Sequence, residues 1–228
     1  MKRPVKGIKG NRILSDLQKE FLHFFKRAEL SRSFWLSGGT ALSAFYLEHR
    51  YSEDLDLFSA KSIPVYEIEA LLRSWNRIEK IHRSRAFERN IYTIYTLDKK
   101  VLKVEFVRYP LKPLYPLLDI EGIKVESFVD IIVNKLCSIA DRSDPKDYVD
   151  VYFGIKQGGL SFKELLELAQ KKCEISGIDH ILKNQLLQIP EGAKGLYLIK
   201  EVDPREMERF FLKSVKEIIE EELEDREI

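Results

Sequence analysis

The chain has 228 residues, of which 44% are hydrophobic and 33% are charged, with a formal net charge of +1. This composition suits one large domain or two small ones with a buried core, and it excludes a disordered chain. It offers neither the ~18–20 apolar residues of a membrane span nor a secretory signal. The two cysteines are too few for a disulfide scaffold or a metal cluster, so we expect a globular cytoplasmic protein with no membrane partner.

The first 125 residues mix helix and strand patterns. Ser15 and Gln18 form a capping-box pattern that predicts a helix. Turn residues and alternating apolar positions mark the elements that follow. The expected elements are a strand at 34–36, a helix at 40–47, a strand at 54–58, a helix from Ser62 and Pro64 to Trp75, a hairpin of strands 91–97 and 101–107, and a short strand near 123–125.

From Ser127 onward the pattern is helical. The predicted helix starts are Ser127, Asp144-Pro145, Ser161 with Glu164, and Asp203-Pro204. Because the strands do not alternate regularly with helices, we expect an α+β fold rather than a doubly wound sheet. We divide the chain into residues 1–125, a core with a basic N-terminal tail, and residues 126–228, a helical domain.

The two parts carry opposite charge. Residues 1–125 have 23 Lys/Arg and 15 Asp/Glu, a balance of +8, whereas residues 126–228 have 15 and 22, a balance of −7. A basic half suggests that it faces an anionic partner. A heat-adapted surface rich in Lys and Glu explains the charges equally well, and the two interpretations are compatible.

Two acids follow a glycine turn. Asp54 and Asp56 are two residues apart on the predicted strand 54–58, so both point to one face, ~7 Å apart. With no cation between them they repel each other, and a divalent metal such as Mg²⁺ relieves this. Upstream, Gly38 and Gly39 allow a close backbone approach to a ligand at a helix start. The alternative to a metal and ligand site is that the two acids are simply solvated and that the glycines form an ordinary turn.

A third acid lies on a later strand. Val104 and Phe106 take the buried face of strand 101–107, so Glu105 shares the other face with Lys103. An acid meeting the first pair from a neighbouring strand would complete a site for two metal ions. Taken alone, Glu105 is better explained as an exposed strand residue or as a partner of Lys103.

A second group of charged residues belongs to the helical half. Lys135 lies among apolar residues, and Asp147 and Asp150 share a face of the next helix. A partly buried lysine beside these aspartates is either a structural ion pair or a clamp for a triphosphate. Spacing alone slightly favours the structural interpretation.

These residues together resemble a known family. Gly38-Gly39-Thr40-Ala41-Leu42, followed by His49-Arg50-x-Ser52-x-Asp54-Leu55-Asp56-Leu57-Phe58, is similar to the signature of the AbiEii/AbiGii-type toxin nucleotidyltransferases, within the DNA polymerase β-like superfamily. Residues 135–152 resemble its second motif, and residues 103–110 the strand with the third acid. Glu105 replaces the commoner Asp and Ser138 a small apolar residue, and neither change removes a role.

The resemblance implies a nucleotidyltransferase-type mixed sheet with flanking helices, followed by a helical half that completes the cleft. It implies transfer of a nucleoside monophosphate from an NTP, with two Mg²⁺ ions and release of pyrophosphate. Relatives are toxins of toxin–antitoxin pairs, and some extend the 3′ end of tRNA, so RNA, tRNA and an antitoxin are implied partners. The implied site comprises catalytic residues Asp54, Asp56, Glu105, Lys135 and Asp147, metal ligands Asp54, Asp56 and Glu105, and nucleotide-binding residues Ser37, Gly38, Gly39, Thr40, Arg50, Ser52 and Lys135.

Two alternatives stay open. The same chemistry can modify a protein hydroxyl or a small molecule such as an antibiotic. A non-catalytic nucleotide- or RNA-binding module on the same fold is the other, although the intact acids Asp54, Asp56 and Glu105 speak against it.

Overall fold

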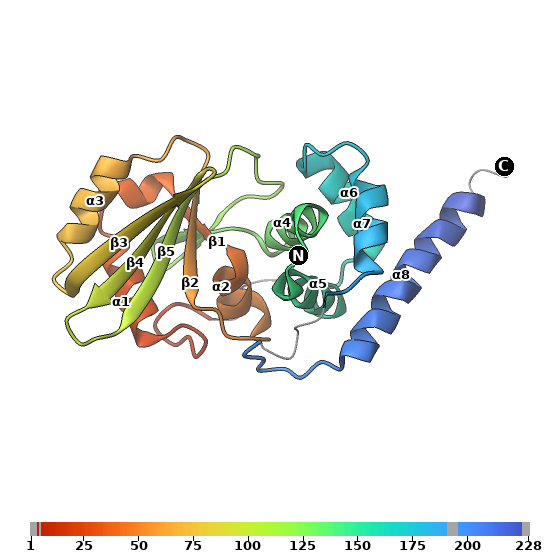
Figure 1. Ribbon diagram of the computed structural model, residues 1–228, viewed down its shortest axis with the longest axis horizontal. Coiled ribbons are helices and arrows are strands. Elements are labelled where there is room, and N and C mark those ends of the chain that lie inside the picture. Colours follow the sequence, from red (N-terminus) through yellow and green to blue (C-terminus); the bar gives the residue numbers. More distant parts are fainter. Residues whose placement is uncertain (1–3, 5, 191–195, 225–228) are drawn as a thin grey trace. The chain divides into compact units, whose positions relative to one another are not determined.

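The computed structural model describes residues 4, 6–190 and 196–224. The chain divides into two compact units after Ser127. We call the part up to Ser127 the sheet unit and the part from Phe128 the helical unit, and describe each by itself (Figure 1). Part of the predicted basic N-terminal tail, residues 1–3 and 5, lies outside the described residues.

The sheet unit is built on seven strands among the described residues, in the order β3-β4-β5-β2-β1-β7-β6. The β2–β5 and β1–β7 pairs are parallel and the others antiparallel, so the sheet is mixed and the expected α+β class is confirmed. The strands are β1 (Trp35–Ser37), β2 (Asp54–Ser59), β3 (Ile78–Ala86), β4 (Arg89–Thr96), β5 (Val101–Arg108), β6 (Leu118–Ile120) and β7 (Ile123–Val125).

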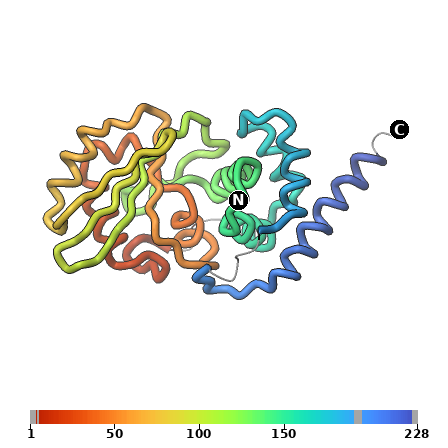
Figure 2. The backbone as a smooth tube through the Cα atoms, in the orientation of Figure 1, coloured from red at the N-terminus to blue at the C-terminus, as the bar shows by residue number. Residues whose placement is uncertain are grey.

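Strands β3, β4 and β5 form a meander that can be followed along the backbone in Figure 2. The β4–β5 hairpin was predicted, whereas β3 was not. Most of β3 is exposed, so it lacks the alternation of buried and exposed positions that marks a strand in a sequence. Pairing with β4 along its whole length makes it a strand.

Helix α1 (Asp16–Phe25) packs on one face of the sheet. Its predicted capping box is confirmed, because Ser15 accepts from the Gln18 backbone N–H and the Gln18 side chain accepts from that of Ser15. Phe25 of α1 contacts Phe106 of β5, with ring centroids 6.0 Å apart. The face that carries Phe106 is therefore the covered one. Figure 1 shows α3 (Val65–Arg73) beside the same strands.

Two predicted helices begin differently from expectation. Helix α3 has Pro64 at its N-cap rather than Ser62 and ends at Arg73, before Trp75. Helix α2 (Gly38–Leu42) includes both glycines that were predicted as a turn, and one π-helical turn, Ser43–Leu47, continues it. The strand β1 therefore passes into a helix with no intervening loop.

The N-terminal segment is anchored where it is described. Ile8 is fully buried, and Leu14 is nearly so. Lys6 and Arg12 both pair with the carboxylate of Glu48, at 3.3 and 2.8 Å. This basic segment therefore packs against the sheet unit.

The helical unit comprises α4 (Phe128–Asp141), α5 (Pro145–Gly158), α6 (Phe162–Lys172), α7 (Ile178–Leu186) and α8 (Pro204–Glu224). Three of its predicted starts are confirmed: Asp144 caps α5, Ser161 with Glu164 forms the capping box of α6, and α8 begins at Pro204. The start of helix α7 was not predicted. Its N-cap is Gly177, which has no side chain to signal a helix start.

Two contacts join α4 to α6. Cys137 of α4 and Cys173, the residue after α6, form a disulfide with their Cα atoms 6.1 Å apart. Lys172 Nζ lies 2.7 Å from Asp130 Oδ1, and both side chains are buried. These two links fix the relative position of the two helices.

No helix in the described ranges is both long and apolar enough to cross a membrane.

Candidate active site

Strand β2 places the first two acids. Asp54 and Asp56 alternate with Leu55 and Leu57, which are almost completely buried. Because side chains alternate along a strand, the two carboxylates lie on the face opposite these leucines. The burial of Leu55 and Leu57 thus confirms that Asp54 and Asp56 share a face of the strand.

Parallel pairing of β2 with β5 brings the third acid to the same face. Asp56 is in register with Glu105, and Asp54 with Lys103. Neighbouring strands are ~4.8 Å apart, and residues in register point the same way. Glu105 alternates with Phe106, which faces α1, so all three acids occupy the face of the sheet that α1 does not cover.

A cation lies among these acids. Lys103 Nζ is 2.9 Å from Asp54 Oδ2 and 2.7 Å from Glu105 Oε1. Arg89 of β4 lies 3.0 Å from the other oxygen of Glu105, so both oxygens of that carboxylate contact a cation. Lys103 thus lies between Asp54 and Glu105, and the alternative that Glu105 partners Lys103 is confirmed. Glu105 is also buried, not an exposed strand residue.

The cations change the ionisation of Glu105. Burial alone would raise its pKa, but the hydrogen bond from Lys103 and the charges of Lys103 and Arg89 lower the pKa of Glu105 below its usual value. Burial would likewise lower the pKa of Lys103, yet the carboxylates of Glu105 and Asp54 raise it. Both groups are consequently charged at neutral pH.

The glycines make room for these side chains. Gly38 has a φ of +70°, and a Cβ at this position would overlap the carboxylate of Asp56. A Cβ at Gly39 would overlap the guanidinium of Arg50. The neighbouring Thr40 donates its hydroxyl to the backbone oxygen of Asp54. This segment therefore holds the start of β2 in place.

The other predicted nucleotide-binding residues are largely buried. Ser37, in register with Asp56, donates to Glu126, a fully buried acid that the sequence did not single out. Arg50 is 4% exposed and donates to the backbone oxygen of Tyr51 at 3.1 Å. The side chain of Ser52 lies near Gly39. These contacts support the shape of the segment, and nucleotide contacts by these residues stay a prediction.

The predicted residues of the helical unit form their own cluster. Lys135 Nζ lies 2.7 Å from Asp147 Oδ1 and 2.9 Å from Asp150 Oδ2, and both aspartates are fully buried. Arg142 lies 3.0 Å from the second oxygen of Asp147. Lys135 is 12% exposed. The predicted ion pair is present, and a role of Lys135 and Asp147 towards a triphosphate stays a prediction.

Sequence reasoning missed Arg89. Its signal was weak, because Arg89 precedes the predicted start of its strand at Ile91. The pairing of β4 with β5 places Ile91 opposite Glu105 and Arg89 opposite Val107, on the same face as the acids. Only the strand register reveals that Arg89 reaches Glu105.

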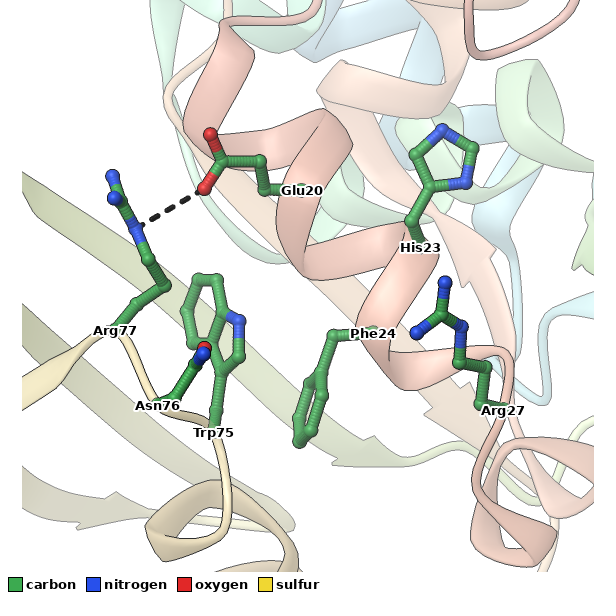
Figure 3. A pocket seen from close by; sticks show the side chains of 7 residues that line it. All are labelled: Glu20, His23, Phe24, Arg27, Trp75, Asn76 and Arg77. Atoms are coloured by element: carbon green, nitrogen blue, oxygen red, sulfur yellow. Dashed lines mark ion pairs between the residues drawn. The ribbon is translucent and has the colours of Figure 1, made fainter.

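A surface hollow of about 300 Å³ lies elsewhere on the sheet unit. Phe24 and Trp75 stack in it with ring centroids 5.6 Å apart, and Glu20 pairs with Arg77 at 3.2 Å (Figure 3). Its lining residues are Glu20, His23, Phe24, Arg27, Trp75, Asn76 and Arg77. Because α1 covers the face opposite the acids, this hollow is separate from the acid cluster.

The chain is similar to known proteins over most of its length. Residues 21–226 match the sequence model of a family described as "Nucleotidyl transferase AbiEii toxin, Type IV TA system". An uncharacterized protein of Aquifex aeolicus, aq_aa25, is 31% identical over 218 residues, which cover 92% of this chain and 99% of the relative.

Two solved structures share the fold. The Helicobacter pylori protein JHP933 is similar with a TM-score of 0.57 and 23% identity, covering 94% of this chain and 96% of that one. A candidate nucleotidyltransferase from H. pylori is similar with a TM-score of 0.58 and 24% identity, covering 93% and 98%.

Proposed function

Since the chain belongs to the AbiEii nucleotidyltransferase toxin family and is a nucleotidyl transfer enzyme, we propose that it transfers a nucleoside monophosphate to RNA. The acceptor hydroxyl, at the 3′ end of a tRNA, attacks the α-phosphorus of an NTP and loses its proton. The bond to the β-phosphate breaks, and pyrophosphate leaves. The protein acts as the toxin of a toxin–antitoxin pair.

The acid cluster carries this proposal. Asp54, Asp56 and Glu105 lie on one face of two paired strands, and their carboxylate oxygens are the ligands that Mg²⁺ prefers. These residues fit a divalent metal by the chemistry of their donors. Within the described residues no group of three His, Cys, Asp or Glu side chains is arranged to hold a metal ion, and Lys103 lies between Asp54 and Glu105. When bound, Mg²⁺ neutralises charge on the triphosphate.

The remaining residues would bind and orient the substrates. Glu105, held by Arg89, would position the acceptor hydroxyl, and the segment of Gly38 and Gly39 would lie beside the NTP. Lys135 of the helical unit would bind the triphosphate, and Asp147 would hold Lys135 in place, as the family resemblance implies. Both oxygens of Glu105 already contact cations, so Glu105 would orient the hydroxyl, and the hydroxyl proton would be released to water.

The face of the sheet that carries the three acids, opposite the face covered by α1, suits an RNA acceptor. By strand register, His82 of β3, Thr93 of β4 and Lys103 of β5 form a row that leads to Asp54. Tyr95 lies in the next row, and His82, Thr93 and Tyr95 all lie outside the acid cluster. Hydroxyls, cations and an aromatic ring are groups that bind phosphates and stack on unpaired bases. The charge of +8 over residues 1–125 favours the same partner.

The test is a labelling experiment with the full chain. The protein is incubated with each α-³²P NTP in turn, Mg²⁺ and total RNA, beside Asp56→Asn as the inactive control. We expect label in the tRNA band with wild type only. Label on protein or on a small molecule would show that the acceptor is not RNA. NTP binding without any labelled product would overturn catalysis.

A further inference from the structure

Lys103 contacts the same carboxylate oxygens that a metal ion would need. Its Nζ lies 2.9 Å from Asp54 Oδ2 and 2.7 Å from Glu105 Oε1, so it joins acids of two different strands. An ammonium within hydrogen-bonding distance of these oxygens and a divalent cation coordinated by them carry like charge. The two therefore compete for the same positions. Metal binding at Asp54 and Glu105 therefore requires Lys103 to move.

The local structure allows that movement. The Lys103 side chain is 38% exposed and ends a flexible four-carbon stem. Glu105 is 7% exposed, and Arg89 holds its other oxygen at 3.0 Å. Arg89 and the strand pairing thus keep Glu105 in position whether or not Lys103 is present. The lysine can leave without disturbing the acids.

On the basis of the proposed function, we propose that Lys103 is an internal counter-ion of the acid cluster that the divalent cation displaces. While no metal is bound, Lys103 offsets the repulsion between the acids. A metal ion that arrives alone must displace the ammonium into water. A metal ion that arrives with an NTP also brings phosphate oxygens, which receive the ammonium. Lys103 thereby couples metal binding to nucleotide binding.

This coupling is measurable without turnover. The probe is Mn²⁺, whose free concentration is followed by electron paramagnetic resonance, with and without an NTP analogue that has a methylene between its α- and β-phosphates. Lys103→Gln and Lys103→Met remove the charge, and Lys103→Arg retains it. Lys80→Gln is the matched control, because Lys80 is an exposed lysine of the same sheet without a contact to the acids.

Without the analogue, both neutral variants should bind Mn²⁺ about tenfold more tightly than wild type, within the usual range of such couplings. Lys103→Arg and Lys80→Gln should bind Mn²⁺ as wild type does. The analogue should tighten Mn²⁺ binding to wild type more than to Lys103→Gln. Thermal melts of each variant show that the comparison is made between folded proteins.

The outcomes separate this inference from the proposed function. If Asp54→Asn abolishes Mn²⁺ binding but Lys103→Gln and Lys103→Met leave it unchanged or weaken it, the role of Lys103 is overturned. The proposed function is then unaffected. A wild-type protein that binds no Mn²⁺, with or without the analogue, would overturn both. If Lys80→Gln and Lys103→Gln tighten Mn²⁺ binding equally, the effect comes from general surface charge and the inference is overturned.

Discussion

Each unit of the protein holds a lysine between two carboxylates, but in different surroundings. In the sheet unit, Lys103 and Asp54 are each 38% exposed. In the helical unit, Lys135 is 12% exposed, and its partners Asp147 and Asp150 are fully buried. An exposed ion pair contributes little to stability and can exchange partners, whereas a buried pair cannot lose one member without stranding the other. The first cluster is therefore suited to bind ions, and the second to hold one geometry.

The largest expected effect concerns the exposed cluster. Asp54→Asn or Asp56→Asn should lower the rate of nucleotide transfer ~10³-fold or more, because the proposed metal site loses a ligand. The melting temperature should stay within a few degrees of wild type, because the Asp54–Lys103 pair is partly exposed. Rates with labelled NTP and thermal melts give the two values. A large loss of stability with activity retained would make the pair structural.

The buried cluster should behave in the opposite way. Lys135→Ala leaves Asp147 and Asp150 buried without their ammonium, at a cost of about 3–5 kcal/mol in the free energy of unfolding. Urea melts measure it. Arg142→Ala is the comparison: Asp147 keeps its contact with Lys135 and Arg142 is 47% exposed, so we expect a smaller loss than for Lys135→Ala.

The double variant Lys135→Ala/Asp147→Ala tests whether Lys135 also acts on the triphosphate. It should regain part of the lost stability, since Asp147 no longer lies buried without the Lys135 ammonium, but not the transfer activity. A double variant that recovers both would show that Lys135 is purely structural.

The disulfide gives an intermediate effect within the helical unit. Cys137 and Cys173 close a loop across 36 residues of sequence, so reduction should lower the free energy of unfolding by about 2–4 kcal/mol. Melts with and without a reducing agent measure this difference. Cys137→Ser/Cys173→Ser should resemble the reduced protein and not respond to the reductant. A response of that variant would show that the reductant acts elsewhere.

The smallest effect concerns Glu48 of the sheet unit. Burial opposes its ionisation, but Arg12 and Lys6 lower the pKa of Glu48 below its usual 4.5. A lowered pKa gives stability that is present above pH 4.5 and is lost as pH falls through the folded-state value. Glu48→Gln should therefore cost up to ~1 kcal/mol at pH 7 and nothing near pH 2. Urea melts between pH 2 and pH 7 measure this loss of stability. A loss that does not change with pH would show that the ion pairs are not its source.

The sequence predicted best where local chemistry determines the structure. The capping boxes at Ser15 and Ser161 and the start at Pro204 depend on neighbouring residues only, and all three are confirmed. The alternation in β2 likewise determines which side of the strand carries Asp54 and Asp56. Such features are visible within a few residues.

What the sequence did not predict depends on distant pairings. Strand β3 is a strand because β4 pairs with it, and its exposed charged residues give no periodic signal. The position of Lys103 between Asp54 and Glu105 follows from the parallel register of β2 and β5, which are 49 residues apart in the Asp54–Lys103 contact. The helical start at Gly38 follows from the fit of that residue against Asp56.

Strand β3 also bears on how the protein behaves at high concentration. It is nine residues long and lies at the edge of the sheet, so one side of its backbone has no neighbouring strand among those described. Such edges invite pairing between molecules, which leads to aggregation. Lys80, His82 and Arg85 project from this edge strand, and two copies aligned along it would bring like charges together. The basic side chains of β3 therefore help to keep an open sheet edge from joining another copy.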